Sequence, residues 1–225
     1  MKRNLTLAVA ALLFIGISSC TKDECECEAP KETTIVLQNE IGDVFDAHLD
    51  FKQSSPGNAN SNTGSLNELA TYSWTVSGDP VTGRCLVGFS LQSIPAGSEI
   101  LSAKLSLYGW PDNFPSVHIT QGNSGDNVLL LQRVTSAWDE NTVTWNTQPS
   151  ITSEGQIELP PSTSTWGYDI MDIDVTNLVK QMVAGTNYGF SLRLKTEATY
   201  RSIGFMSSEY EVPAKRPKLE ITYRK

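Results

Sequence analysis

Residues 45–52 read Phe45-Asp46-Ala47-His48-Leu49-Asp50-Phe51-Lys52, with apolar and polar side chains alternating at every position. Successive side chains of a β-strand point to opposite faces, so the pattern predicts a strand with one packed face and one solvated face. Strands with one packed and one solvated face are typical of antiparallel sheets. The stretch therefore predicts an antiparallel β fold.

The same alternation recurs in residues 102–107, 171–175 and 218–223. Shorter strand candidates are bounded by clusters of Gly, Pro, Asn and Ser. They are residues 34–37, 84–91, 117–120, 128–134, 190–195 and 203–207.

One helix is predicted, after the capping residues 174–177. Leu178, Val179, Met182 and Val183 recur at helical spacing, and Gly185 follows where a left-handed residue often ends a helix. About ten strands with one short helix predict an all-β fold, a two-sheet antiparallel β-sandwich of jelly-roll type.

The N-terminus predicts a lipoprotein signal peptide over residues 1–19. A basic start is followed by an apolar run, residues 5–17, and by Ser18-Ser19-Cys20. The run is shorter than the about 20 apolar residues of a membrane-spanning helix. The cut site resembles a bacterial lipobox, which implies cleavage before Cys20 and lipidation of its thiol. An ordinary signal peptide with a chance cysteine is the alternative.

Residues 20–33 predict a lipidated flexible tether, because they are charged, contain Pro30 and have no apolar periodicity. Thr21-Lys22-Asp23-Glu24 is similar to the signal that carries Bacteroidetes lipoproteins to the cell surface. We therefore expect a lipid-anchored protein of the outer membrane, exposed on the cell surface, with the inner leaflet of that membrane as the alternative. The lipid alone would hold it there.

Composition favours one domain, residues 34–225, of the larger all-β type. Without residues 1–19 the chain keeps 206 residues, of which 15 are basic and 25 acidic, a net charge of −10. No basic patch is available to neutralise phosphates, which argues against a nucleic-acid partner. Solubility alone also explains the acidity.

The four cysteines indicate no complete metal site. Cys20 is assigned to lipid, and Cys25 and Cys27 lie in the tether, where Cys-x-Cys without a second pair is an incomplete zinc set. Cys85 alternates with apolar residues and is interpreted as a buried small hydrophobe. The pairing state of Cys25, Cys27 and Cys85 stays open.

A series of short motifs follows in a distinctive order along the domain. They are Asp46-Ala47-His48-Leu49, residues 83–91, 94–100 and 102–108, Trp138-Asp139-Glu140-Asn141-Thr142-Val143-Thr144-Trp145-Asn146, residues 174–176 and 187–189, Phe205-Met206-Ser207-Ser208-Glu209, and residues 217–219. From about residue 43 to 223, this order resembles the DNRLRE-domain family. That family is related to archaeal disaggregatase accessory domains and to alginate-binding carbohydrate modules.

The resemblance implies a jelly-roll sandwich that is usually non-catalytic and is often fused to polysaccharide-degrading enzymes or displayed at cell surfaces. The sequence departs from the family pattern in residues 84–91. There the family often has a basic residue and an aspartate, whereas this chain has Gly88 and Ser90.

Catalytic motifs are absent, so we expect no enzyme. The chain has two histidines; neither lies in a nucleophile motif, and His118 is expected to point from a strand to solvent. Asp169, Asp172 and Asp174 could pair as acid and base, as in glycosidases. A plain polar face is the favoured explanation.

Two metal sites are considered. Asp46, His48 and Asp50 share one face of a strand and could bind a transition metal, although any solvated sheet face shows such residues. Calcium binds six to eight oxygens, which makes it a possible structural cofactor. The loop oxygens of the right type belong to Asp43, Asn58, Asn60, Asn62 and Asp126. Loop asparagines are also common simply because they tolerate turns.

Aromatic side chains in or beside turn-rich stretches are the ligand-binding candidates, since sugar C–H faces stack on flat rings. They are Trp74, Trp110, Phe114, Trp166 and Tyr168. Trp110 and Phe114, braced by Pro111 and Pro115, are expected to form the best exposed platform; a lid folded onto the core is the alternative. Trp138 and Trp145 are expected to pack in the core. Basic candidates for uronic-acid ligands are Arg84, Lys104, Arg133, Arg193 and Arg201, although the net acidity counts against a polyanion.

Three functions are compatible with these features. The first is a surface-displayed, non-catalytic domain that binds polysaccharide as a carbohydrate-binding module. The second is a structural or adhesive surface domain that contacts protein or matrix. The third is a polysaccharide hydrolase or lyase, which would need a cleft holding carboxylates with perturbed pKa values.

Overall fold

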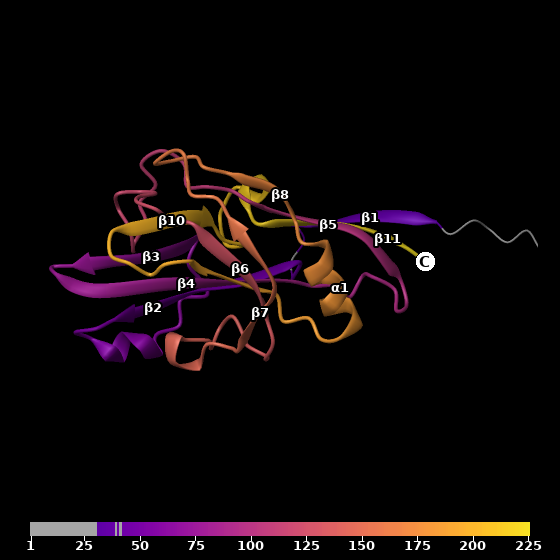
Figure 1. Cartoon of the computed structure of the whole chain (residues 1–225), viewed down its shortest axis with the longest axis horizontal. Coiled ribbons are helices and arrows are strands. Elements are labelled where there is room, and N and C mark those ends of the chain that lie inside the picture. Colours follow the sequence, from indigo (N-terminus) through magenta and orange to yellow (C-terminus); the bar gives the residue numbers. More distant parts are fainter. Residues whose placement is uncertain (1–30, 39, 41) are drawn as a thin grey trace, which may run out of the picture.

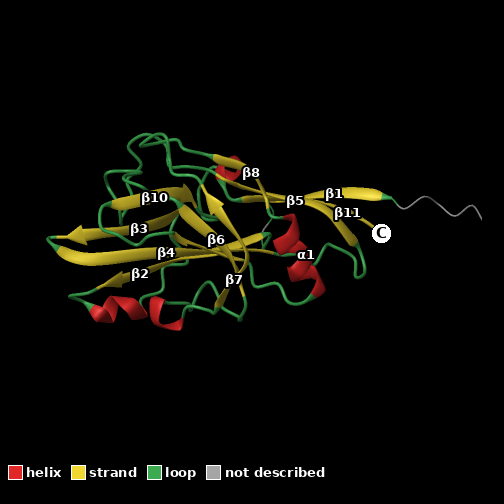
Figure 2. Ribbon diagram, in the orientation of Figure 1, coloured by secondary structure: helices red, strands yellow, loops and turns green. Residues whose placement is uncertain are grey.

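The computed structural model describes residues 31–38, 40 and 42–225, and it shows an all-β fold of two antiparallel sheets (Figures 1 and 2). The first sheet has the order β1-β11-β5-β8. Its strands are β1 (Glu32–Leu37), β11 (Lys218–Arg224), β5 (Glu99–Leu107) and β8 (Ile170–Asp174). The predicted fold class is confirmed.

The second sheet has the order β10-β3-β4-β9-β6-β7, and β2 pairs with β4 beside this path. Its strands are β2 (Val44–Lys52), β3 (Glu68–Val76), β4 (Asp79–Phe89), β6 (Leu129–Val134), β7 (Ile151–Leu159), β9 (Phe190–Leu194) and β10 (Arg201–Met206). Figure 1 shows β2, β4, β3 and β10 side by side along the long axis.

Helical structure is sparse in the described part of the chain. The predicted helix is α1 (Thr176–Ala184), which buries Leu178, Val179 and Met182. Gly185 ends it with a φ of −124°, so the expected left-handed cap is wrong. Three short 3-10 helices are η1 (Pro56–Asn60), η2 (Trp145–Thr147) and η3 (Pro213–Lys215). Among the described residues, no helix has the length and apolar character needed to span a membrane.

The main core combines apolar residues of both sheets with those of α1. Its largest members include Phe89, Leu105, Leu131, Phe190 and Ile221. A second cluster joins Tyr72 on β3 to the long β5–β6 connection, and a third covers β2 and β4 with residues of the β6–β7 connection. Cys85 is fully buried, as predicted.

Strand β2 confirms the alternation of residues 45–52 but not its solvated face. Ala47 and Leu49 pack in the third cluster, as expected for the apolar face. On the polar face, however, Asp46 and His48 are each only 1% exposed. Both faces are covered because the chain returns over β2 from two sides, so the expectation of a solvated face is wrong for these two residues.

The region of His118 is not a strand. Residues 117 and 118 form a bend within the long β5–β6 connection, where Val117 is exposed and Ile119 buried. The His118 ring lies 4.0 Å from that of His48, centre to centre, instead of pointing to solvent. The predictions of a strand at 117–120 and of a solvent-facing His118 are therefore wrong.

The alternation in β8 is interrupted by a bulge. Leu105 and Leu107 of β5 face Ile173 and Ile170 of β8, so β8 carries one extra residue between them. Asp172 adopts a φ of 54° at this point. As a result Met171, which was predicted to be buried with Ile173, is exposed.

The N-terminal predictions fall mostly on residues that the structure does not describe. The signal peptide over residues 1–19, the lipidated Cys20, and Cys25 and Cys27 all lie outside the described residues. Within the predicted tether, Glu32 and Thr33 already belong to β1, because they pair with Arg224 and Tyr223 of β11.

Candidate functional site

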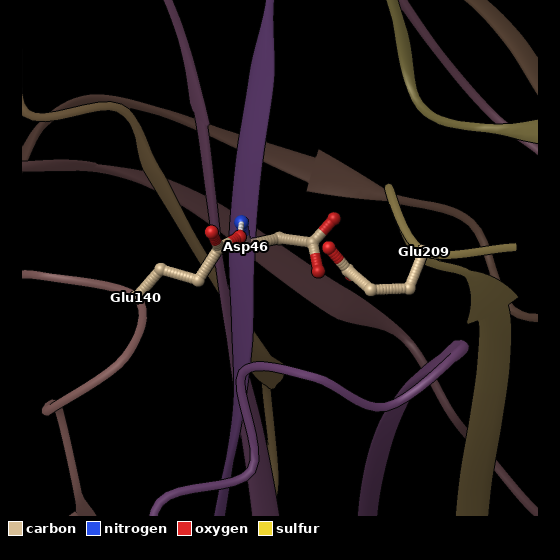
Figure 3. Close-up of side chains that lie close together, drawn as sticks. All are labelled: Asp46, Glu140 and Glu209. Atoms are coloured by element: carbon tan, nitrogen blue, oxygen red, sulfur yellow. Dashed lines mark hydrogen bonds between the residues drawn. The ribbon is translucent and has the colours of Figure 1, made fainter. Parts of the chain in front are cut away.

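Three carboxylates from distant parts of the chain form an acidic cluster, defined as Asp46, Glu140 and Glu209. One oxygen of each lies within 4.8 Å of the other two. Asp46 is on β2, Glu140 lies between β6 and η2, and Glu209 follows β10. Figure 3 shows the Asp46 carboxylate pointing towards Glu209, while Glu140 reaches the backbone of Asp46 from the other side.

Backbone N–H groups hold the acidic cluster in place. The Asp46 amide donates to Glu140 Oε1 at 2.6 Å, and the Ser208 amide donates to Asp46 Oδ2 at 2.7 Å. The Ser208 hydroxyl lies 2.9 Å from both Glu209 oxygens. The cluster is therefore organised by direct contacts among three segments.

These segments are the motifs Asp46–Leu49, Trp138–Asn146 and Phe205–Glu209 that carry the family resemblance. The Pro56–Gly64 loop fixes the second of them: the Asn62 amide donates to the carbonyls of Glu140 and Val143, at 2.7 Å each. Gly64 packs so closely that a Cβ there would lie 2.1 Å from the Glu140 carbonyl oxygen. Three of the motifs that are separate in the sequence therefore meet at the acidic cluster in the fold.

The electrostatics of the acidic cluster disfavour its ionised form. Burial raises the pKa of Asp46 well above its usual value, and repulsion by Glu209 raises it further, against the Ser208 hydrogen bond. Burial also raises the pKa of Glu140, although the Asp46 amide opposes this shift. Such a site gains from sharing a proton or binding a cation. Carboxylate oxygens suit calcium, whose charge would offset the repulsion.

A pocket of about 430 Å³ opens beside the cluster and is lined by Glu140, Ser208, Glu209 and Arg216, among others. Carboxylates with raised pKa values beside a pocket meet one condition for a hydrolase. The buried Asp46 does not line this pocket, and one of its oxygens accepts a backbone hydrogen bond. The geometry therefore fits cation binding better than attack on a substrate.

Four of the five loop residues expected to bind calcium make side-chain contacts within the protein, and the calcium role of all five stays a prediction. Asp43 Oδ2 accepts from the amides of Gln38 and Glu40, and Asn60 Oδ1 accepts from Asn146. Asp126 pairs with Arg201. Asn62 holds the Glu140 segment, as described above, and Asn58 is exposed in η1.

Glu140 and Glu209 were not identified as site residues from the sequence, because their proximity to Asp46 depends on tertiary structure.

The expected exposed platform of Trp110 and Phe114 is wrong. Trp110 is 1% exposed, its Nε1 donates to the Phe205 carbonyl at 2.9 Å, and its ring stacks on Phe114. The indole lies against Gly204, where a Cβ would be 2.1 Å from the ring. The loop between Pro111 and Pro115 folds back onto β10. The two rings therefore cover the core, which was the alternative interpretation of this stretch.

Trp74, Trp166 and Tyr168 are half-buried, and their ligand-binding role stays a prediction. Trp74 lies within β3 rather than in a turn-rich stretch, and its ring packs edge to face against Tyr200, 5.0 Å between centres. Tyr200 was not predicted, yet its side chain is 59% exposed. Its backbone φ of 68° is rare for a residue with a side chain, and local sequence does not indicate it.

Trp138 and Trp145 pack against the third cluster, as expected, although both are half-buried. Trp138 Nε1 donates to the Tyr188 carbonyl at 2.8 Å. The Trp145 ring stacks on Phe51 and lies 4.5 Å from the Arg84 guanidinium carbon. These neighbours leave Trp145 little free ring face.

Two of the three aspartates considered as acid and base have structural partners. Asp169 accepts from the Gly109 amide and pairs with Lys215. Hydrogen bonds from Thr176 lower the pKa of Asp174. Asp172 lies at the β8 bulge. Two basic candidates are likewise paired, Arg84 with Glu197 and Arg201 with Asp126.

Comparison with known proteins identifies the family of the chain. No curated protein matches the chain. The model of carbohydrate-binding module family 96 matches residues 46–223, a span that runs from Asp46 on β2 to Tyr223 on β11 and includes all three carboxylates of the acidic cluster. The chain belongs to carbohydrate-binding module family 96.

Proposed function

We propose that this chain is a non-catalytic module that captures polysaccharide at the cell surface and is anchored there by lipid on Cys20. Membership of a carbohydrate-binding family supports the ligand class and the non-catalytic role. The lipobox-like sequence around Cys20 supports the anchor.

The proposed ligand platform is the pair formed by Tyr200 and Trp74. Tyrosine and tryptophan are enriched at binding interfaces, because each combines a large apolar ring with a polar group. Tyr200 is the observation that carries this choice, because it is 59% exposed and braced edge to face by Trp74. One face of a pyranose ring presents C–H groups, and these would stack on the open face of Tyr200.

The platform is held by its backbone surroundings. Gly125 lies so close to Tyr200 that a Cβ would be 2.4 Å from the Tyr200 carbonyl oxygen. Ser124 and Ser202 exchange backbone hydrogen bonds of 2.9 and 3.0 Å. A left-handed tyrosine persists only where its neighbours impose it, and such strain concentrates at binding sites.

A calcium ion in the acidic cluster is the second part of the proposal. Asp46, Glu140 and Glu209 would be its protein ligands, and the ion would supply the positive charge that this cluster lacks. Its role is structural: it would tie β2 to the segments that follow β6 and β10.

The test is a glycan-array screen with the chain from residue 20 onward, carrying Cys20→Ser so that it is soluble, with and without calcium. Selective binding to a polysaccharide class, without release of reducing ends, is the expected result. A folded sample that binds no acidic, neutral or host glycan would refute the proposal and favour a structural or adhesive domain. Release of reducing ends would instead favour an enzyme.

A further inference from the structure

The chain has two histidines, and the fold brings them together. His48 lies on β2 and His118 on the β5–β6 connection, with ring centres 4.0 Å apart and ring planes at 50°. Tyr72 flanks both rings, at 5.6 and 6.0 Å. The only imidazoles available to this protein therefore share one site.

His48 is buried without hydrogen-bond partners. It is 1% exposed, and neither Nδ1 nor Nε2 has a partner in the structure. A neutral imidazole has one unshared nitrogen lone pair, and this is the form that binds metal ions. A buried unpaired polar group calls for a water or an ion.

His118 is oriented by a buried carboxylate. Its Nδ1 lies 2.7 Å from Glu68 Oε1, and Glu68 is 2% exposed. A neutral His118 donates from Nδ1 to this carboxylate, which leaves the lone pair on Nε2. Carboxylate–histidine pairs of this kind orient histidines that bind metal in other proteins.

We propose that His48 and His118 bind a divalent first-row transition metal ion of the zinc, cobalt or nickel type, with Glu68 orienting His118. An ion bound at about 2.1 Å lies about 3.2 Å from each imidazole centre, so ligand–metal–ligand angles of 90° and 109° place the two ring centres about 4.5 Å and about 5.2 Å apart. The ring centres are 4.0 Å apart in the structure, so ion binding would move the His118 ring outwards by about 0.5 to 1.2 Å. Water would complete the coordination, since His118 retains some exposure.

This site is chemically distinct from the acidic cluster. Imidazole nitrogens prefer late transition metals, whereas carboxylate oxygens prefer calcium and magnesium. It also differs from a set of Asp46, His48 and Asp50, because Asp46 belongs to the acidic cluster and Asp50 accepts a hydrogen bond from the Tyr72 hydroxyl.

The test measures cobalt and zinc binding by the metal-free chain from residue 20 onward with Cys20→Ser, Cys25→Ser and Cys27→Ser, which removes the competing thiols before β1. Cobalt is monitored by its visible absorption and zinc by calorimetry. We expect one ion per chain, and we expect His118→Gln to weaken binding at least about tenfold. Glutamine keeps a hydrogen-bonding group near Glu68, and circular dichroism checks the fold. Glu154→Gln, on the exposed part of β7, is the matched control and should bind cobalt as the parent does.

Equal affinity in the parent and in folded His118→Gln would overturn the proposal. So would the absence of binding, or a cobalt spectrum with thiolate bands, which would place the ion on Cys85. A zinc-soaked crystal with only water between the two rings would also overturn it.

Discussion

At the residue scale, Asp46 has the least favourable electrostatic environment in the acidic cluster. Its pKa is raised in the folded state, so the protonated form contributes stability that is present below the unfolded value of 3.8. That contribution is lost as pH rises through the folded pKa. Without a cation, Asp46 therefore makes the free energy of unfolding smaller at neutral pH than at low pH.

Asp46→Asn removes this charge and keeps an acceptor for the Ser208 amide. In EDTA at pH 7 we expect the variant to melt a few degrees higher than the parent, and the difference should shrink towards pH 4. A saturating calcium concentration should raise the parent's melting temperature by about 5 °C and leave the variant unchanged. Glu154→Gln, on the exposed part of β7, is the control. A parent indifferent to calcium would exclude the calcium site.

The buried Trp110 gives a second prediction at this scale. The Trp110 ring is 1% exposed, and its Nε1 donates a hydrogen bond to the Phe205 carbonyl. Trp110→Ala should therefore leave a cavity and remove this donor from the carbonyl. We expect a loss of about 3–5 kcal/mol in the free energy of unfolding, measured by urea denaturation. The glycan affinity of the folded fraction should not change. A loss of glycan affinity without a loss of stability would show that Trp110 binds the ligand.

At the scale of the elements, the convergence on Glu140 depends on the loop that follows β2. Asn62→Ala would remove two hydrogen bonds, to the carbonyls of Glu140 and Val143. We expect about 1–3 kcal/mol of destabilisation and a smaller calcium-induced rise in melting temperature. Asn58→Ala is the matched control, since Asn58 is exposed in the same loop. If the two variants behave alike, this loop does not support the cluster.

Sequence patterns predicted strands that have one buried and one exposed face, such as β11. They missed β3 and β7, in which the two faces are similarly buried or similarly exposed. β3 is buried over Glu68–Ser73 on both faces, so it shows no alternation, and most of β7 is exposed and polar. Alternation in β2 predicted a strand correctly but could not reveal that a second layer covers its polar face. The period-2 alternation of side chains identifies a strand, but it does not show which other segments pack on the two faces of that strand.

The same limit applies to the candidate site. The motifs containing Asp46, Glu140 and Glu209 were recognised, but as separate pieces, because contacts between residues up to 163 positions apart are fixed only by the fold. Trp110 was assigned to the surface from its turn-rich neighbours, yet Gly204 on β10 leaves the space that its ring fills. Local composition carried no information about that contact.

At the scale of the whole molecule, the proposed anchor makes a prediction that is independent of the ligand. Cys20→Ser should abolish incorporation of labelled fatty acid in the producing cells and move the protein from the membrane to the soluble fraction. For the parent, protease added to intact cells should degrade the protein. Lipid label that persists in the variant would show that Cys20 is not the modified residue, and protection from protease would place the parent inside the outer membrane.

The central claim is that a folded sandwich presents Tyr200 to polysaccharide. The most direct measurement compares the glycan affinity of the parent, of Tyr200→Ala and of Val117→Ala, which truncates a side chain 71% exposed elsewhere. Stacking of a sugar on an aromatic ring predicts at least a tenfold loss of affinity for Tyr200→Ala, about 1.4 kcal/mol, with Val117→Ala unchanged. Equal affinities in all three proteins, each folded, would contradict the account.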